Sequence, residues 1–155
     1  MKKISFVLFI AVLVLTSCNR DVWFMEGEYS YKISGRVELK SADTTINRSI
    51  DDEIGVLRIL SQDSKDEEVV LAFNPLGGSV VTTTARIDGK KIELQNFEKI
   101  LHLRAASLTD EEFVVDVSGT GERYKTTIVF SLDYKGKNSD GTFSLEGNDL
   151  RMVAY

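Results

Sequence analysis

Two long stretches of the chain alternate apolar and polar residues with a period of two. From Tyr29 to Leu39, aromatic and aliphatic residues fall on one face and polar residues on the other, and Gly35 interrupts the apolar face. The stretch from Tyr124 to Lys135 repeats this pattern. Period-two alternation is typical of a strand with one buried face. We therefore predict a long strand in each stretch, with a bend, bulge or close backbone approach at Gly35.

Shorter β-prone runs fill most of the remaining chain. Glycine-rich stretches separate them and predict turns at Gly119–Arg123 and Gly147–Asp149, and Asp88-Gly89 predicts a tight hairpin. The segment Asn96–Leu108 fits poorly, and we predict an irregular link with one helical turn; the alternative is a strand with Ile100, His102 and Arg104 on one face. The predicted shorter strands are 44–50, 54–60, 69–74, 79–87, 91–97, 113–117, 142–146 and 150–154.

These elements predict an all-β domain over residues 29–155. About eight to ten short strands joined mostly by hairpins must avoid free edges, either as a single antiparallel meander barrel, which we favour, or as a two-sheet β-sandwich. Trp23-Phe24 precedes the first strand, Gly27-Glu28-Tyr29 opens it, and the meander continues to Tyr155. In this arrangement the chain resembles the lipocalin-like (calycin) barrels found among small bacterial lipoproteins.

The start of the chain has the pattern of a membrane-targeting signal. Lys2 and Lys3 precede a run from Ile4 to Leu15 that is apolar except at Ser5. The run is shorter than the roughly 20 apolar residues of a membrane span and has the proportions of a signal-peptide core. Leu15-Thr16-Ser17-Cys18 follows. This sequence resembles the lipobox of bacterial lipoproteins.

The lipobox resemblance implies processing and a lipid anchor. Residues 1–17 would be a signal peptide, Leu15, Thr16 and Ser17 would be recognised by the lipoprotein signal peptidase, and Cys18 would carry acyl chains such as palmitate. Residues 18–28 would then form a short tether. More than one acyl chain anchors a protein stably without spanning the bilayer. Asn19 follows the cysteine, which in the family's sorting rule implies the outer rather than the inner membrane of the cell envelope.

Composition and charge exclude several classes of function. The chain has 155 residues and a formal net charge of −5, and no basic face is evident for nucleic acid. One histidine and one cysteine argue against an internal disulfide, most zinc sites and a Cys–His dyad. No Gly-x-Ser-x-Gly or phosphate-binding motif is present. We expect no catalytic residue, cofactor or metal, and therefore a protein that is not an enzyme.

Two hypotheses about function remain open at this point. In the first, the barrel binds a small apolar or amphipathic ligand in a pocket whose aromatic residues are Tyr29, Tyr31, Phe130, Tyr134 and Phe143. In the second, these aromatics fill a solid core, and the protein is a structural or interaction lipoprotein that contacts envelope proteins or glycans through its surface. The volume enclosed by the domain separates the two hypotheses.

Overall fold

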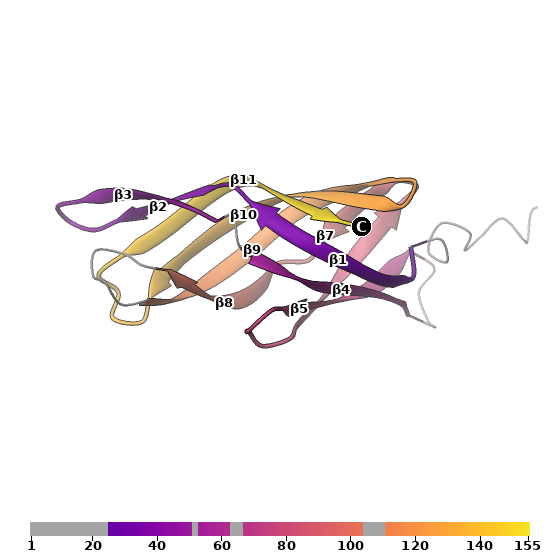
Figure 1. The fold of residues 1–155 in the computed structure, drawn as a ribbon, viewed down its shortest axis with the longest axis horizontal. Helices are drawn as coiled ribbons and strands as arrows, with labels where there is room; N and C mark the ends of the chain where they lie inside the picture. The colour runs from indigo at the N-terminus through magenta and orange to yellow at the C-terminus, as the bar shows by residue number, and fades with distance from the viewer. Residues whose placement is uncertain (1–24, 51–52, 63–66, 104–110) are drawn as a thin grey trace, which may run out of the picture.

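The chain folds as an all-β domain, shown in Figure 1. The computed structural model describes residues 25–50, 53–62, 67–103 and 111–155. The predicted signal peptide and Cys18 lie outside these residues. The described strands are β1 (Gly27–Ser34), β2 (Arg36–Lys40), β3 (Thr45–Ser49), β4 (Glu53–Ser61), β5 (Glu68–Pro75), β6 (Val81–Asp88), β7 (Lys91–Leu94), β8 (Phe97–Leu103), β9 (Glu111–Tyr124), β10 (Thr127–Asn138) and β11 (Ser144–Ala154).

Eight of these strands close into an antiparallel barrel, as the strand pattern predicted. The pairing runs β1-β4-β5-β6-β7-β9-β10-β11, and β11 pairs with β1 to complete the ring. The favoured barrel is therefore confirmed over the two-sheet sandwich. The Asp88-Gly89 hairpin is also confirmed, since Asp88 pairs with Lys91 and Gly89 takes a φ of +59°.

The barrel opens at one end, where β9, β10 and β11 continue beyond the ring. The first part of β9 leaves β7 and pairs with β8, and the first part of β11 leaves β1 and pairs with β2. The β2–β3 hairpin projects from this end in Figure 1. Within the described ranges, β3 pairs only with β2 and β8 pairs only with β9, so the sheet is open between β3 and β8.

The predicted bend at Gly35 is confirmed and produces this extension. Gly35 has a φ of +152°, a region that L side chains rarely adopt, and an added Cβ would collide with the Leu150 side chain. The long predicted strand is therefore divided there into β1, which belongs to the barrel wall, and β2, which belongs to the extension.

Most of the interior is packed with apolar side chains. Inward positions alternate along every long strand, and Phe113, Phe130, Leu132 and Met152 are at most 1% exposed. A continuous cluster of such residues runs through the barrel, and Tyr29, Phe97 and Phe143 pack against it as partly buried residues. This packed cluster provides the hydrophobic stabilisation of the fold.

Two predicted turns are wrong, because both glycine-containing stretches lie within strands. The stretch Gly119–Arg123 lies inside β9, where a Cβ at Gly121 would lie 2.5 Å from the Phe130 ring. The chain reverses later, after Tyr124, where Lys125 has a φ of +54°. Likewise, Gly147–Asp149 is not a turn between two strands. It is a bulge within β11, where the register with β10 shifts and the Asp149 N–H donates to Asp133 Oδ1 at 3.0 Å.

The predicted irregular link over Asn96–Leu108 is also wrong for the residues described. Phe97–Leu103 forms β8, paired with Glu111–Val117 of β9. Phe97, Lys99, Leu101 and Leu103 alternate as the less exposed residues of β8. Because Lys99 stands among the apolar residues of this face, the alternation typical of a strand was not evident in the sequence.

Candidate functional site

A cavity of about 710 Å³ lies at the open end of the barrel. It is lined by β8, by the start of β4 and by the turn between β5 and β6, together with side chains from β1 and β10. Its buried lining residues include Tyr31, Leu132 and Tyr134, whereas Leu76 and Ile100 are 79% and 54% exposed. The cavity therefore leads from an exposed apolar rim to the buried interior.

Three aromatic rings form one wall of the cavity. Phe73 and Phe97 are stacked, with ring centroids 5.3 Å apart and an interplanar angle of 15°. Tyr31 meets Phe73 edge to face, with centroids 6.1 Å apart. These are the arrangements that aromatic pairs favour. The wall joins β1, β5 and β8, so it links the closed barrel to the strand at its open edge.

A buried ion pair lies in the same cavity. Lys99 Nζ contacts Glu53 Oε1, and the two side chains are 11% and 14% exposed. Lys99 also donates to the Tyr134 hydroxyl at 2.9 Å and lies 4.6 Å from the centroid of that ring. Burial lowers the pKa of Lys99, and the adjacent Glu53 carboxylate opposes this change. Lys99 belongs to β8 and Glu53 begins β4, so the ion pair links two strands that are not hydrogen-bonded to each other.

One atom of this polar cluster has no partner. Glu53 Oε2 is buried and accepts no hydrogen bond from any described residue. The Tyr31 hydroxyl, on a residue that lines the same cavity, makes no hydrogen bond within the described ranges either. An unsatisfied buried acceptor is rare in native proteins, and a hydrogen-bond donor on a ligand would satisfy this one.

The two phenols of the cluster remain neutral. Burial, and after it the Glu53 carboxylate, raises the pKa of Tyr31 far above its ordinary value of 10.0. The pKa of Tyr134 is raised by burial first and then by Glu53 and Tyr31. The buried polar cluster therefore contains the Glu53 carboxylate, the Lys99 ammonium group that offsets it and two neutral phenol hydroxyls, while the exposed Glu98 and His102 also line the cavity.

The five aromatic residues predicted to line a pocket are distributed over the whole barrel. Tyr31 and Tyr134 line the cavity. Phe130 is fully buried in the packed core, and Tyr29 is half-buried with its hydroxyl donating to the Met25 carbonyl at 3.0 Å. Phe143 lies at the β10–β11 turn, where its N–H donates to Asn138 Oδ1 at 2.8 Å. The structure thus brings two of the five together.

Sequence reasoning missed Glu53 and Lys99. A detectable signal was present for Lys99, which shares its face of β8 with Phe97 and Leu101. A lysine on an apolar strand face must be paired or exposed at its tip. No comparable signal marked Glu53, which stands in an acidic cluster of the sequence.

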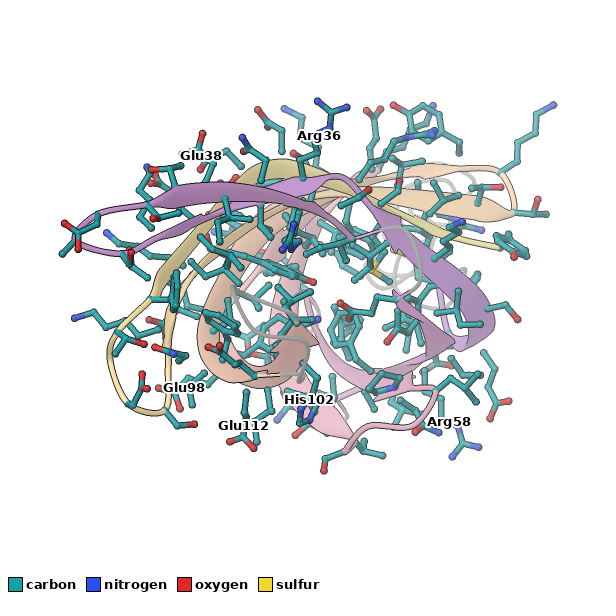
Figure 2. The ribbon with its side chains drawn as sticks, turned by 60° about the vertical axis from the view of Figure 1, so that its left-hand side comes forward. Arg36, Glu38, Arg58, Glu98, His102 and Glu112 are labelled. Atoms are coloured by element: carbon teal, nitrogen blue, oxygen red, sulfur yellow. The ribbon has the colours of Figure 1, made fainter. Side chains whose placement is uncertain are left out.

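The remaining chemistry of the described chain is sparse. His102 is exposed on the outer face of β8, opposite Glu112 of β9. Figure 2 shows His102, Glu98 and Glu112 directed away from the ribbon, on the side opposite Arg36 and Glu38. The described segments contain no group of three or more His, Cys, Asp or Glu placed to hold a metal. They also include no helix with the length and apolar character that a membrane crossing requires.

A second hollow, of about 720 Å³, lies on the outside of the barrel. Its lining comes from β6, β7, β9, β10 and β11 and includes both positive and negative side chains. Arg86 and Arg151 lie in it together with Glu93, Glu122 and Asp149. Because its charges are mixed and its polar residues are exposed, this hollow has no preference for a ligand of one sign.

Comparison with known proteins gives only remote structural likeness. No protein-family model matches the sequence, and no curated protein matches it. A redesigned beta barrel aligns over 87% of this chain and 93% of its own, with 11% identity and a TM-score of 0.40. A mutant of the vaccine antigen Transferrin Binding Protein B from Haemophilus parasuis aligns over 83% of this chain, with 16% identity and a TM-score of 0.43. This chain spans 26% of the length of that antigen.

Proposed function

We propose that this protein is a lipid-anchored, non-enzymatic protein of the cell envelope that binds a small amphipathic ligand at the open end of its barrel. The observation that carries the proposal is the cavity of about 710 Å³ beside an otherwise packed core. Binding sites for small molecules typically enclose about 300–1,000 Å³, with apolar walls and a few placed polar groups. The aromatic wall and the Glu53–Lys99–Tyr134 cluster match that description.

Ligand binding is tested with a fluorescent apolar probe. We expect 1-N-phenylnaphthylamine to bind the purified protein with one site and to gain fluorescence. Val81→Trp should abolish this binding, because Val81 lines the cavity and a larger side chain would fill it. Val70→Trp is the matched control, since Val70 is also half-buried in the sheet but does not line the cavity. Equal binding to both variants, or no binding to the unaltered protein, would contradict the proposal.

Lipid anchoring is supported by the lipobox-like sequence that ends at Cys18, and Asn19 favours the outer membrane. We expect intact-mass analysis of the protein from bacterial membranes to show loss of residues 1–17 and a gain of two or three acyl chains, because more than one chain is needed for a stable anchor. Cys18→Ser should release the protein from the membrane fraction. A retained leader or an unmodified thiol at Cys18 would refute anchoring and leave the ligand proposal intact.

A second candidate function is contact with another envelope protein or a glycan. It is favoured by the edges of β3 and β8, which pair with no further strand of the described chain. Open sheet edges offer backbone groups for strand addition by a partner. Cross-linking in cells through a photoreactive residue at Asn47 of β3 should capture a reproducible partner if this function holds. Absence of any cross-linked product would exclude it.

A further inference from the structure

We propose that the cavity prefers amphipathic ligands whose polar head is neutral and donates a hydrogen bond, such as a primary alcohol, over ligands of equal chain length that end in a carboxylate. This inference rests on the proposed ligand-binding function. It follows from the polar groups that the cavity presents and from those that are already satisfied.

The ammonium group of Lys99 already has partners within the cavity. Lys99 Nζ is held by Glu53 Oε1 and by the Tyr134 hydroxyl, and both partners line the cavity with it. Because Glu53 offsets Lys99, the cluster offers no net positive charge to a ligand carboxylate. A carboxylate would also approach Glu53 Oε2, a second negative oxygen, in a site where burial weakens screening. The cavity is therefore unfavourable for acids.

The groups that remain unsatisfied fit a hydroxyl. Glu53 Oε2 needs a donor, and a ligand O–H can supply it. The Tyr31 hydroxyl has a proton to donate, and Glu53 lies close enough to raise the pKa of that phenol. The oxygen of the same ligand hydroxyl can accept from Tyr31. A primary alcohol would thus satisfy both groups, whereas an alkylammonium would donate but could not accept.

The apolar part of such a ligand has a defined place. The stacked rings of Phe73 and Phe97 and the buried Leu101 side chain line the cavity next to the polar cluster. The exposed rim residues Leu76 and Ile100 continue this apolar surface outward. A chain with its head at Glu53 can therefore run along the aromatic wall toward the opening.

The test compares three ligands with the same chain and different heads. Decan-1-ol, decanoate and decylammonium each compete with 1-N-phenylnaphthylamine at pH 7.5, the alcohol below its solubility limit and the two ionic ligands below their critical micelle concentrations. We expect decan-1-ol to bind the unaltered protein at least about tenfold more tightly than decanoate, which corresponds to one hydrogen bond to a charged group. Equal displacement by the alcohol and the acid would overturn the inference and leave the proposed binding function standing. Failure of all three ligands and of the probe would instead refute the proposed function itself.

Two variants test whether Glu53 and Tyr31 determine the preference for the alcohol over the acid. Glu53→Gln removes the acceptor charge and leaves Lys99 uncompensated, so the preference should reverse in favour of decanoate. Glu67→Gln is the matched control, because Glu67 pairs with Arg86 on the surface and does not line the cavity. Tyr31→Phe should weaken decan-1-ol binding and leave binding of 1-N-phenylnaphthylamine unchanged. If circular dichroism shows that Glu53→Gln does not fold, Tyr31→Phe decides alone, and an unchanged alcohol preference in it would overturn the inference.

Discussion

Replacing Lys99 with methionine tests whether the buried ion pair holds the open end of the barrel together. Methionine keeps the unbranched shape of the side chain, one heavy atom shorter, and removes its charge, which leaves the Glu53 carboxylate buried without a charge partner. Removing one member of a fully buried pair costs about 3–5 kcal/mol of folding free energy. The two side chains here are 11% and 14% exposed, which places the expected loss at the lower end, at about 3 kcal/mol.

The assay is urea denaturation followed by far-ultraviolet circular dichroism, supported by thermal melting. A loss of about 3 kcal/mol should lower Tm by about 10 °C in a domain of this size. Glu53→Met in the same chain should also be destabilising, and the double variant should recover most of the loss because neither charge is then buried alone. If Lys99→Met costs less than about 0.5 kcal/mol, or if the two single effects simply add, the ion pair does not stabilise the fold.

Three further predictions follow from features of the barrel. The pKa values of the buried Tyr31 and Tyr134 are raised, so above pH 10 the unfolded chain loses these protons before the folded protein does. The free energy of unfolding should therefore be unaffected by these tyrosines below pH 10 and should fall above it by about 1.4 kcal/mol per pH unit for each tyrosine. Urea denaturation at increasing pH should show a steeper fall for the unaltered protein than for Tyr134→Phe, and equal slopes would refute the prediction. Gly35→Ala should lower the free energy of unfolding, measured by urea denaturation, by about 2 kcal/mol or more, because its backbone φ disfavours alanine and the new Cβ would collide with Leu150. Gly77→Ala is the control: its φ also disfavours alanine, but no atom lies near the new Cβ, so the loss should be smaller. Phe130→Ala should lower the free energy of unfolding by about 3–5 kcal/mol without changing the affinity for 1-N-phenylnaphthylamine, because this ring fills the packed core. Tyr155→Ala, at an exposed position, is the control. A changed affinity in Phe130→Ala would place Phe130 at the binding site.

The fold was largely predictable because the alternation of apolar residues is strong and local. The strand containing Phe130 to Tyr134, the bend at Gly35 and the Asp88-Gly89 hairpin are each determined by nearby residues. The two wrong turn predictions arise where a glycine has a second physical role, whereas the missed strand β8 arises from Lys99 on its less exposed face. Gly121 lies within a strand because the Phe130 ring covers it, and that ring belongs to a different strand. A single sequence gives the same glycine pattern for a turn and for such a close approach.

The candidate site was less predictable because it is assembled from distant segments. Glu53 and Lys99 are 46 residues apart, and β4 and β8, which carry them, do not pair with each other. Their contact depends on how far the barrel opens at its end, which no local pattern specifies. Tyr31 and Tyr134 were predicted as inward-facing aromatic residues because strand alternation alone specifies that orientation. The sequence therefore predicted only Tyr31 and Tyr134 of the aromatic lining, and it predicted neither the stacked Phe73 and Phe97 nor the charged pair.

The β2–β3 hairpin is attached to the rest of the sheet through a short ladder, in which only residues 144–146 of β11 pair with β2. The pairings that close the eight-strand ring do not include either strand of the hairpin. Local opening of the hairpin would therefore leave the ring intact, and its amide protons should exchange with solvent well before those of β10. Opening of the hairpin would expose Val37 and Leu39, which β2 contributes to the buried core, so the hairpin and the ring are separable in hydrogen bonding but share the hydrophobic interior.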